Sequence, residues 1–203
     1  MKKQSPLAAM IVPLLRSPIV PLLVFYVARS ALQLSWWMAF ALLILIQPAL
    51  QFLVMQLGEK LEVGEPAPTE PFTTLKFVQG APVLPKAGSV TVIEFWATWC
   101  PPCKTAIPHL NALWLKHKAS GDVQFVGVTA EDEAKVASFI REMGDSFTYP
   151  VALDAGREAH TAFPSQGIPH AYIIGKDGNI AWAGHPMSGL DGALQRAIDA
   201  KGE

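Results

Sequence analysis

The sequence has few cysteines and little charge, and each shortage excludes a class of protein. Two of its 203 residues are cysteines. A structural zinc would need two more ligands, and the five histidines do not supply them at the usual spacing. The net charge is -1, so the chain lacks the basic footprint of a nucleic-acid-binding protein, and nucleic acid is not an expected partner. The sequence shows no internal repeats, and its length suits one ordinary domain with an extension.

Charge is missing altogether from residues 31–57, ALQLSWWMAFALLILIQPALQFLVMQL. About 20 apolar residues cross a bilayer as an α-helix, so this run predicts a transmembrane helix, with a buried core helix as the weaker alternative. Pro48 can kink such a helix without preventing it from spanning the membrane. A cleaved signal peptide fits less well, because the apolar run is longer than usual.

The residues on either side of this run predict the side of the membrane that the rest of the chain occupies. Basic residues precede it, among them Arg16 and Arg29, whereas residues 59–65 carry more acid than base. The positive-inside rule then places the N-terminus in the cytoplasm. A single crossing of the cell membrane would put everything downstream on the periplasmic or extracytoplasmic side. Residues 6–28 are a poor span, but a second crossing there would reverse this topology.

Composition predicts three segments. We expect a membrane anchor over residues 1–57, a linker rich in Gly, Pro and Glu over residues 58–71, and a folded domain over residues 72–203. Two buried strands, TVIEFW (91–96) and VQFVGVT (123–129), are expected on either side of a helix at 101–118, where apolar residues recur at helical spacing. Further expected elements are a helix at 131–143, a strand at 148–153, a hairpin at 170–184 and a helix at 189–201.

The two cysteines, Cys100 and Cys103, fall where the first strand meets the first helix. A Cys-x-x-Cys at that junction puts both sulfurs on the first helical turn, where they can form and break a disulfide. The positive end of the helix favours a thiolate at the first sulfur. We therefore expect Cys100 to be the nucleophile at an exposed helix start and Cys103 to lie one turn inward. A purely structural disulfide is the weaker alternative, because so short a loop stabilises little.

Glu94 lies six residues before Cys100, within a strand that is otherwise apolar. Burial penalises a charged carboxylate, so a buried Glu94 would have a raised pKa and could exchange a proton with Cys103. The alternative is a carboxylate on an exposed edge of the sheet.

The motif VIEFWATWCPPCKTAIP, with GIPHAYIIGKDGNIAWAG downstream, closely resembles the thioredoxin superfamily. Together with the predicted anchor, it is similar to the membrane-anchored TlpA/ResA-like thiol-disulfide oxidoreductases. The resemblance covers roughly residues 66–200. Trp96 and Trp99 match the family's aromatic pair before the first cysteine, and Pro108 matches its helix-kinking proline. Residues 122–162 form a longer stretch than in plain thioredoxin.

The resemblance implies an α/β thioredoxin-like fold, in which helices flank a central mixed sheet, preceded by an N-terminal transmembrane helix. Pro169, which sequence alone would leave trans, is implied to be a cis-proline that faces the cysteines. The Ile168 backbone would pair with an extended substrate, and Trp99 would contribute to the same binding surface. A catalytic acid is also implied at Glu94, whereas Ala106 stands where many ResA-like proteins carry a second glutamate.

Two histidines downstream of the cysteines have open roles. His170 could tune the thiolate or simply begin a strand, and the sequence assigns no function to His185.

The resemblance further implies an enzyme without a cofactor, a protein-disulfide reductase or thiol-disulfide oxidoreductase that works through its Cys-Pro-Pro-Cys site. Its expected partners are a protein thiol or disulfide, a membrane electron donor, and lipid around the anchor. One example of such a role is the reduction of protein disulfides in cytochrome c maturation. The motif does not determine the direction of electron flow. The alternative is a Sco-like copper-binding metallochaperone, although Sco proteins typically space their cysteines three residues apart. No metal ligand is predicted.

Overall fold

The computed structural model describes residues 61–200, together with Tyr26, Ala41 and residues 44–47. The chain divides into two units, Met1–Lys60 and Leu61–Glu203. Most of the predicted transmembrane run, residues 31–57, lies outside the described residues, and the few described positions in it are helical. Among the described residues, no helix is both long enough and apolar enough to cross a membrane.

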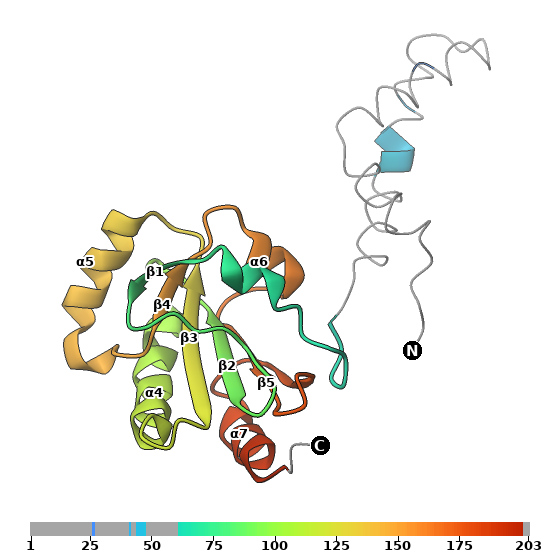
Figure 1. The fold of residues 1–203 in the computed structure, drawn as a ribbon. Coiled ribbons are helices and arrows are strands. Elements are labelled where there is room, and N and C mark those ends of the chain that lie inside the picture. The colour runs from blue at the N-terminus through green and yellow to red at the C-terminus, as the bar shows by residue number, and fades with distance from the viewer. Residues whose placement is uncertain (1–25, 27–40, 42–43, 48–60, 201–203) are drawn as a thin grey trace. The chain divides into compact units, whose positions relative to one another are not determined.

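A six-stranded mixed sheet forms the centre of the second unit, in the order β1-β4-β3-β2-β5-β6 (Figure 1). Its strands are β1 (Lys76–Gln79), β2 (Val90–Phe95), β3 (Val123–Thr129), β4 (Val151–Leu153), β5 (His170–Ile174) and β6 (Ile180–Gly184). The central strands β2, β3 and β4 are parallel. Strands β1, β5 and β6 run antiparallel to their neighbours. The predicted parallel core followed by an antiparallel hairpin is confirmed, whereas β1 is an additional edge strand.

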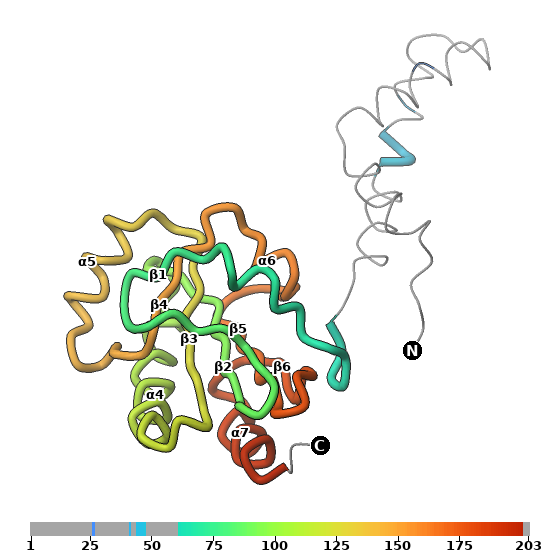
Figure 2. Tube along the Cα trace, in the orientation of Figure 1, coloured from blue at the N-terminus to red at the C-terminus, as the bar shows by residue number. Residues whose placement is uncertain are grey.

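Helices cover both faces of this sheet. They are α4 (Pro101–His117), α5 (Glu133–Met143), α6 (Glu158–Ala162) and α7 (Leu190–Asp199), with short 3-10 turns η1 (Glu70–Thr73) and η2 (Gly144–Ser146). Apolar residues of α4, α5 and α7 pack in one core cluster, and those of η1 and α6 pack in another. The chain passes from β2 through α4 and back to β3, which gives the expected strand-helix-strand unit (Figure 2).

Strand β2 shows how the sequence divides its side chains between these two layers. All six of its residues are buried. Val90 and Val92 pack on the α4 side, whereas Ile93 and Phe95 pack on the α6 side. Because side chains alternate along a strand, Glu94 falls on the α4 side with Val90 and Val92.

The segment expected as a linker is partly hydrogen-bonded to the sheet. The Gly64 N–H donates to the Ile180 carbonyl at 2.8 Å, and the Ile180 N–H donates to the Glu65 carbonyl at 2.8 Å. Pro66 forms an isolated antiparallel bridge with Asn179. Pairing with the sheet therefore begins several residues before the expected domain start at residue 72.

Candidate active site

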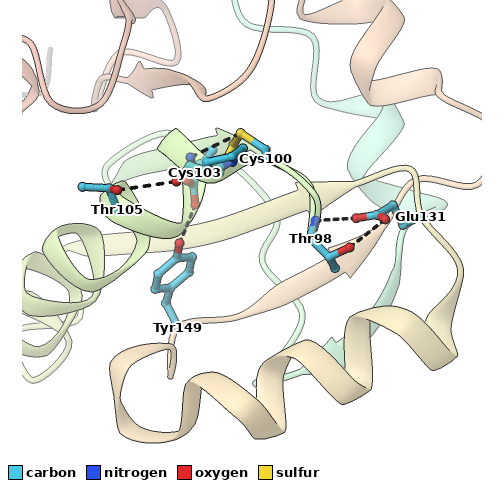
Figure 3. The surroundings of a disulfide bond; sticks show 8 residues. Thr98, Cys100, Cys103, Thr105, Glu131 and Tyr149 are labelled. Carbon is cyan, nitrogen blue, oxygen red and sulfur yellow. Dashed lines mark hydrogen bonds between the residues drawn. A yellow bond between two sulfur atoms is a disulfide. The ribbon is translucent and has the colours of Figure 1, made fainter.

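Cys100 and Cys103 form a disulfide at the start of α4, with their Cα atoms 5.3 Å apart (Figure 3). Cys100 is the N-cap of the helix, and its Sγ accepts a hydrogen bond from the Cys103 N–H at 3.2 Å. Pro101 and Pro102 fill the first turn, where backbone N–H groups have no helical partner anyway. The predicted junction of strand and helix is confirmed, and it gives the first sulfur a backbone donor that would stabilise a thiolate.

Both sulfurs are covered in this oxidised state. Cys100 is 2% exposed and Cys103 is 0% exposed. The expectation that Cys100 stands at an exposed helix start is therefore wrong. Both cysteines belong to the apolar cluster of the α4 face, and Ile168 packs against that cluster.

Glu94 is a buried acid in the middle of the sheet. It pairs with Gly127 of β3 on one side and with Ala171 of β5 on the other, and it is 1% exposed. Burial raises the pKa of Glu94 from 4.5 to about 8, and a hydrogen bond from Tyr149 partly offsets this rise. The buried interpretation is confirmed, and the alternative of an exposed sheet edge is wrong.

Tyr149 is a site residue that sequence reasoning missed. Its hydroxyl donates a hydrogen bond to Glu94 Oε2, whereas Glu94 Oε1 has no partner among the described residues. In Figure 3 the Tyr149 side chain points toward the start of α4, where the cysteines lie. Burial, together with the charge of Glu94 and its hydrogen bond, raises the pKa of Tyr149 well above its ordinary value. The contact spans 55 positions, and no local pattern marks it.

The Ile168–Pro169 peptide bond is cis, as the resemblance implied. Pro169 is buried and directly precedes β5. The first residue of β5, His170, pairs with Phe95 at the end of β2. Because β2 leads into the cysteine loop, this pairing brings the cis-proline to the same end of the sheet as the disulfide.

Two of the predicted substrate-binding residues, Trp99 and Ile168, line one cleft of about 470 Å³. Trp99 is 69% exposed although it directly precedes a buried cysteine. The loop between β3 and α5 lines another part of the cleft, and the segment around α6 completes it. An open site with an apolar wall thus lies beside the disulfide, and the roles of Trp99 and Ile168 in binding stay predictions.

A carboxylate holds the loop that carries Trp99 and Cys100. The Thr98 N–H and Oγ1 donate to the two oxygens of Glu131, at 2.6 Å and 2.9 Å (Figure 3). Sequence reasoning missed this pair, because its members come from two different loops and neither belongs to a periodic pattern.

His170 is the first residue of β5, which agrees with the interpretation that it begins a strand. Its ring packs against Tyr172 with centroids 5.0 Å apart. Burial lowers the pKa of His170, and the neighbouring His185 lowers it further. Tyr172 belongs to the core cluster on the α6 side of the sheet, so the His170 ring lies away from α4.

Within the described part of the chain, no group of three or more His, Cys, Asp or Glu side chains is arranged to hold a metal ion.

A disulfide at a helix N-terminus, with a buried acid on the same face of the sheet and a cis-proline at the same end, is an arrangement suited to thiol-disulfide exchange. The fold and the site define a thioredoxin-like thiol-disulfide oxidoreductase, and the chain is an enzyme of that class. It belongs to the AhpC/TSA family, which matches residues 63–183.

Individual relatives agree with this assignment. The chain is 31% identical over 125 residues to thiol-disulfide oxidoreductase ResA of Bacillus thuringiensis (strain Al Hakam), a match that covers 60% of this chain and 69% of ResA. It is 28% identical over 111 residues to sporulation thiol-disulfide oxidoreductase A of Bacillus subtilis (strain 168), covering 52% and 66% of the two chains. A solved thiol:disulfide interchange protein of the thioredoxin family from Chlorobium tepidum TLS is similar at a TM-score of 0.52 and 25% identity, covering 66% and 96%. The resemblance to ResA-like oxidoreductases is confirmed.

Proposed function

We propose that this enzyme is anchored in the cell membrane and reduces protein disulfides outside the cytoplasm. The observation that carries the chemistry is the Cys100–Cys103 disulfide at the N-terminus of α4, on the same face of the sheet as an acid whose pKa burial raises to about 8. The uncharged run at residues 31–57 supports the anchor and its contact with lipid. A membrane electron donor would restore the dithiol after each cycle, as in cytochrome c maturation.

The proposed reaction starts from the reduced enzyme. The Cys100 thiolate attacks one sulfur of a substrate disulfide, forms a mixed disulfide and displaces the first substrate thiolate. Cys103 then attacks the Cys100 sulfur, which releases the second substrate thiolate and closes the enzyme disulfide. Two electrons pass to the substrate, and no cofactor takes part.

Glu94 is proposed to accept the proton that Cys103 loses when it attacks. Burial gives Glu94 a pKa of about 8, which is near neutral pH, so this carboxyl can accept a proton and return it within one cycle. Tyr149 positions the carboxyl through its hydrogen bond to Oε2.

The substrate is proposed to bind as an extended segment across the cysteine loop. The backbone of Ile168, held by cis-Pro169, would pair with that segment, and the exposed Trp99 ring would cover its apolar side chains. No ligand set among the described residues favours the copper-carrier alternative.

The location is tested by fusing alkaline phosphatase, which is active only after export, behind Glu65. We expect an active phosphatase and an inactive cytoplasmic reporter at the same position, because a single crossing exports the second unit. The reverse result would show two crossings and would contradict the proposed location.

The direction of electron flow is tested by the redox potential of the full-length chain in detergent. A reductase should lie nearer to the value of thioredoxin, about -270 mV, than to that of DsbA, about -120 mV. A value close to that of DsbA would contradict the proposed reductase while leaving the disulfide chemistry intact.

A further inference from the structure

The cleft beside the disulfide contains an arginine whose guanidinium has no partner among the described residues. Arg157 precedes α6 and lines the same cleft as Trp99 and Ile168. Among the described residues, its guanidinium takes part in no ion pair and no side-chain hydrogen bond. Arg157 lies within residues 122–162, the stretch that is longer than in plain thioredoxin. The cleft therefore combines positions that the thioredoxin superfamily shares, Trp99 and Ile168, with a residue from the longer stretch.

The backbone of Arg157 is held in an unusual conformation. Its φ angle is 56°, and it is the sole non-glycine residue with a positive φ in the described part of the chain. Glycine or asparagine is the ordinary choice for such a backbone. Three hydrogen bonds fix it: the Arg157 N–H donates to the Asp154 carbonyl at 2.9 Å, and its own carbonyl accepts from Thr161 N–H at 2.9 Å and Oγ1 at 2.7 Å. These hydrogen bonds fix the backbone from which the Arg157 side chain extends.

The other two ionisable side chains that line the cleft, Glu131 and His160, are already engaged. Both oxygens of Glu131 accept hydrogen bonds from Thr98, and Figure 3 shows this carboxylate turned toward the cysteine loop. His160 Nδ1 lies 2.6 Å from Asp154 Oδ2, and its ring packs against Phe95. Arg157 is thus the charged side chain of the cleft that is left for a bound molecule.

We propose that this cleft binds the carboxylate of an acidic residue close to the reactive cysteine of the protein substrate. Arg157 supplies the charge, and its planar guanidinium can donate two parallel hydrogen bonds to a carboxylate. Trp99 and Ile168 place the apolar part of the same segment beside the disulfide. The inference rests on the proposed function, because it specifies which protein disulfides the enzyme prefers.

Matched peptides test this preference. Each peptide carries one cysteine as its mixed disulfide with 2-mercaptoethanol. One of the four positions next to that cysteine, two before it and two after it, is either Glu or Gln. The reduced full-length chain in detergent transfers two electrons to this mixed disulfide, releases the peptide thiol and 2-mercaptoethanol, and forms its own Cys100–Cys103 disulfide. The measured quantity is the single-turnover rate constant, expressed as the ratio between the Glu and Gln peptides.

We expect at least one position at which the Glu peptide reacts about fivefold faster than the Gln peptide. Arg157→Gly should bring this ratio close to one while keeping the melting temperature, because glycine adopts a positive φ without strain. Arg157→Lys should keep part of the preference, and Arg157→Glu should reverse it. The matched control Arg141→Gln removes a positive charge from the last turn of α5, outside the cleft, and should leave the ratio unchanged.

Equal rates at every position, or a preference that survives Arg157→Gly, would overturn the inference while leaving the reductase function standing. Failure to reduce either peptide would instead count against the proposed function itself.

Discussion

Two buried carboxyls lie in the same domain, and their surroundings differ. Glu94 is 1% exposed and Asp154 is 3% exposed. Glu94 receives one hydrogen bond, from Tyr149, and its second oxygen has no partner among the described residues. Asp154 Oδ2 accepts the His160 backbone N–H at 2.9 Å and lies 2.6 Å from the His160 ring nitrogen.

The difference distinguishes the acid that we propose to react from one that holds the fold together. A buried carboxylate with several donors is stabilised in its charged form, whereas one with few donors is favoured in its neutral form. Glu94 lies on the sheet face that carries the cysteines, and Asp154 anchors the short helix α6 through His160. The domain therefore leaves a carboxyl incompletely hydrogen-bonded on the face of the sheet where we propose that a proton is transferred.

The largest expected effect comes from removing the sulfur chemistry that Glu94 is proposed to serve. Cys100→Ser should abolish exchange and form no adduct, because the attacking thiolate is lost. Cys103→Ser should still attack but cannot resolve, so mixed disulfides with natural partners should accumulate on a non-reducing gel. If Cys100→Ser were the variant that captured partners, the two roles would have to be exchanged.

The second effect is on stability, and it differs in sign between the two carboxyls. The pKa of Glu94 is about 8 in the folded protein against an ordinary 4.5, so between these values the folded chain keeps a proton that the unfolded chain has released. The stability due to Glu94 is full below pH 4.5 and is lost as pH rises toward 8, on the order of 1.4 kcal/mol per pH unit. Glu94→Gln should remove this loss, so the oxidised variant should be more stable than wild type by a few kcal/mol at pH 8.

Urea unfolding of the oxidised full-length chain between pH 5 and pH 9 checks this prediction. The two proteins should be similar at pH 5 and should diverge as pH rises. A difference that does not change with pH would show that Glu94 is not held in its neutral form.

The third effect is on rate. Glu94→Gln should slow disulfide exchange roughly 10- to 100-fold near pH 7, because the ionised form of Glu94, which is the minor form at that pH, is the proposed proton acceptor for Cys103. The deficit should shrink above about pH 8.5, where a free thiol ionises without help. Stopped-flow measurement across this range checks the prediction, and an equal rate for both proteins near neutral pH would remove Glu94 from the mechanism.

The smallest effect is expected at Asp154, where the same change from carboxyl to amide should destabilise the fold. Asp154→Asn weakens the charge-assisted contact with His160, which should lower the free energy of unfolding by about 1 to 2 kcal/mol. Its effect on the exchange rate should be smaller than that of Glu94→Gln. The same urea titration measures the free energy of unfolding of this variant. If Asp154→Asn were more stable than wild type, the proposed difference between the two acids would be contradicted.

The sequence predicted the parts of this molecule that depend on local patterns. The apolar runs of β2 and β3 and the helical spacing in α4 predicted the unit that carries the cysteines. The charge of Glu94 within an apolar strand was itself the signal that marked it. The resemblance supplied the cis-proline, for which the residues alone gave no reason.

The missed features depend on contacts between distant segments or on elements too short to show a period. Strand β1 has four residues and α6 has five, which is too few for a repeat to be recognised. Tyr149 and Glu94 are 55 positions apart, and Thr98 and Glu131 are 33 apart. The burial of Cys100 was missed for the same reason, since the cluster that covers it is assembled from several strands and helices.

The pairing of residues 64–67 with the hairpin around β6 has a consequence for how the domain behaves beside other copies of itself. Strand β6 is the last strand of the sheet, and an uncovered last strand offers unpaired N–H and C=O groups to any passing chain. Here Gly64, Glu65 and Ala67 use such groups at Ile180 and Gly178. The segment that leads into the domain therefore also acts as a terminator, which stops the sheet from growing at the beginning of its outermost strand.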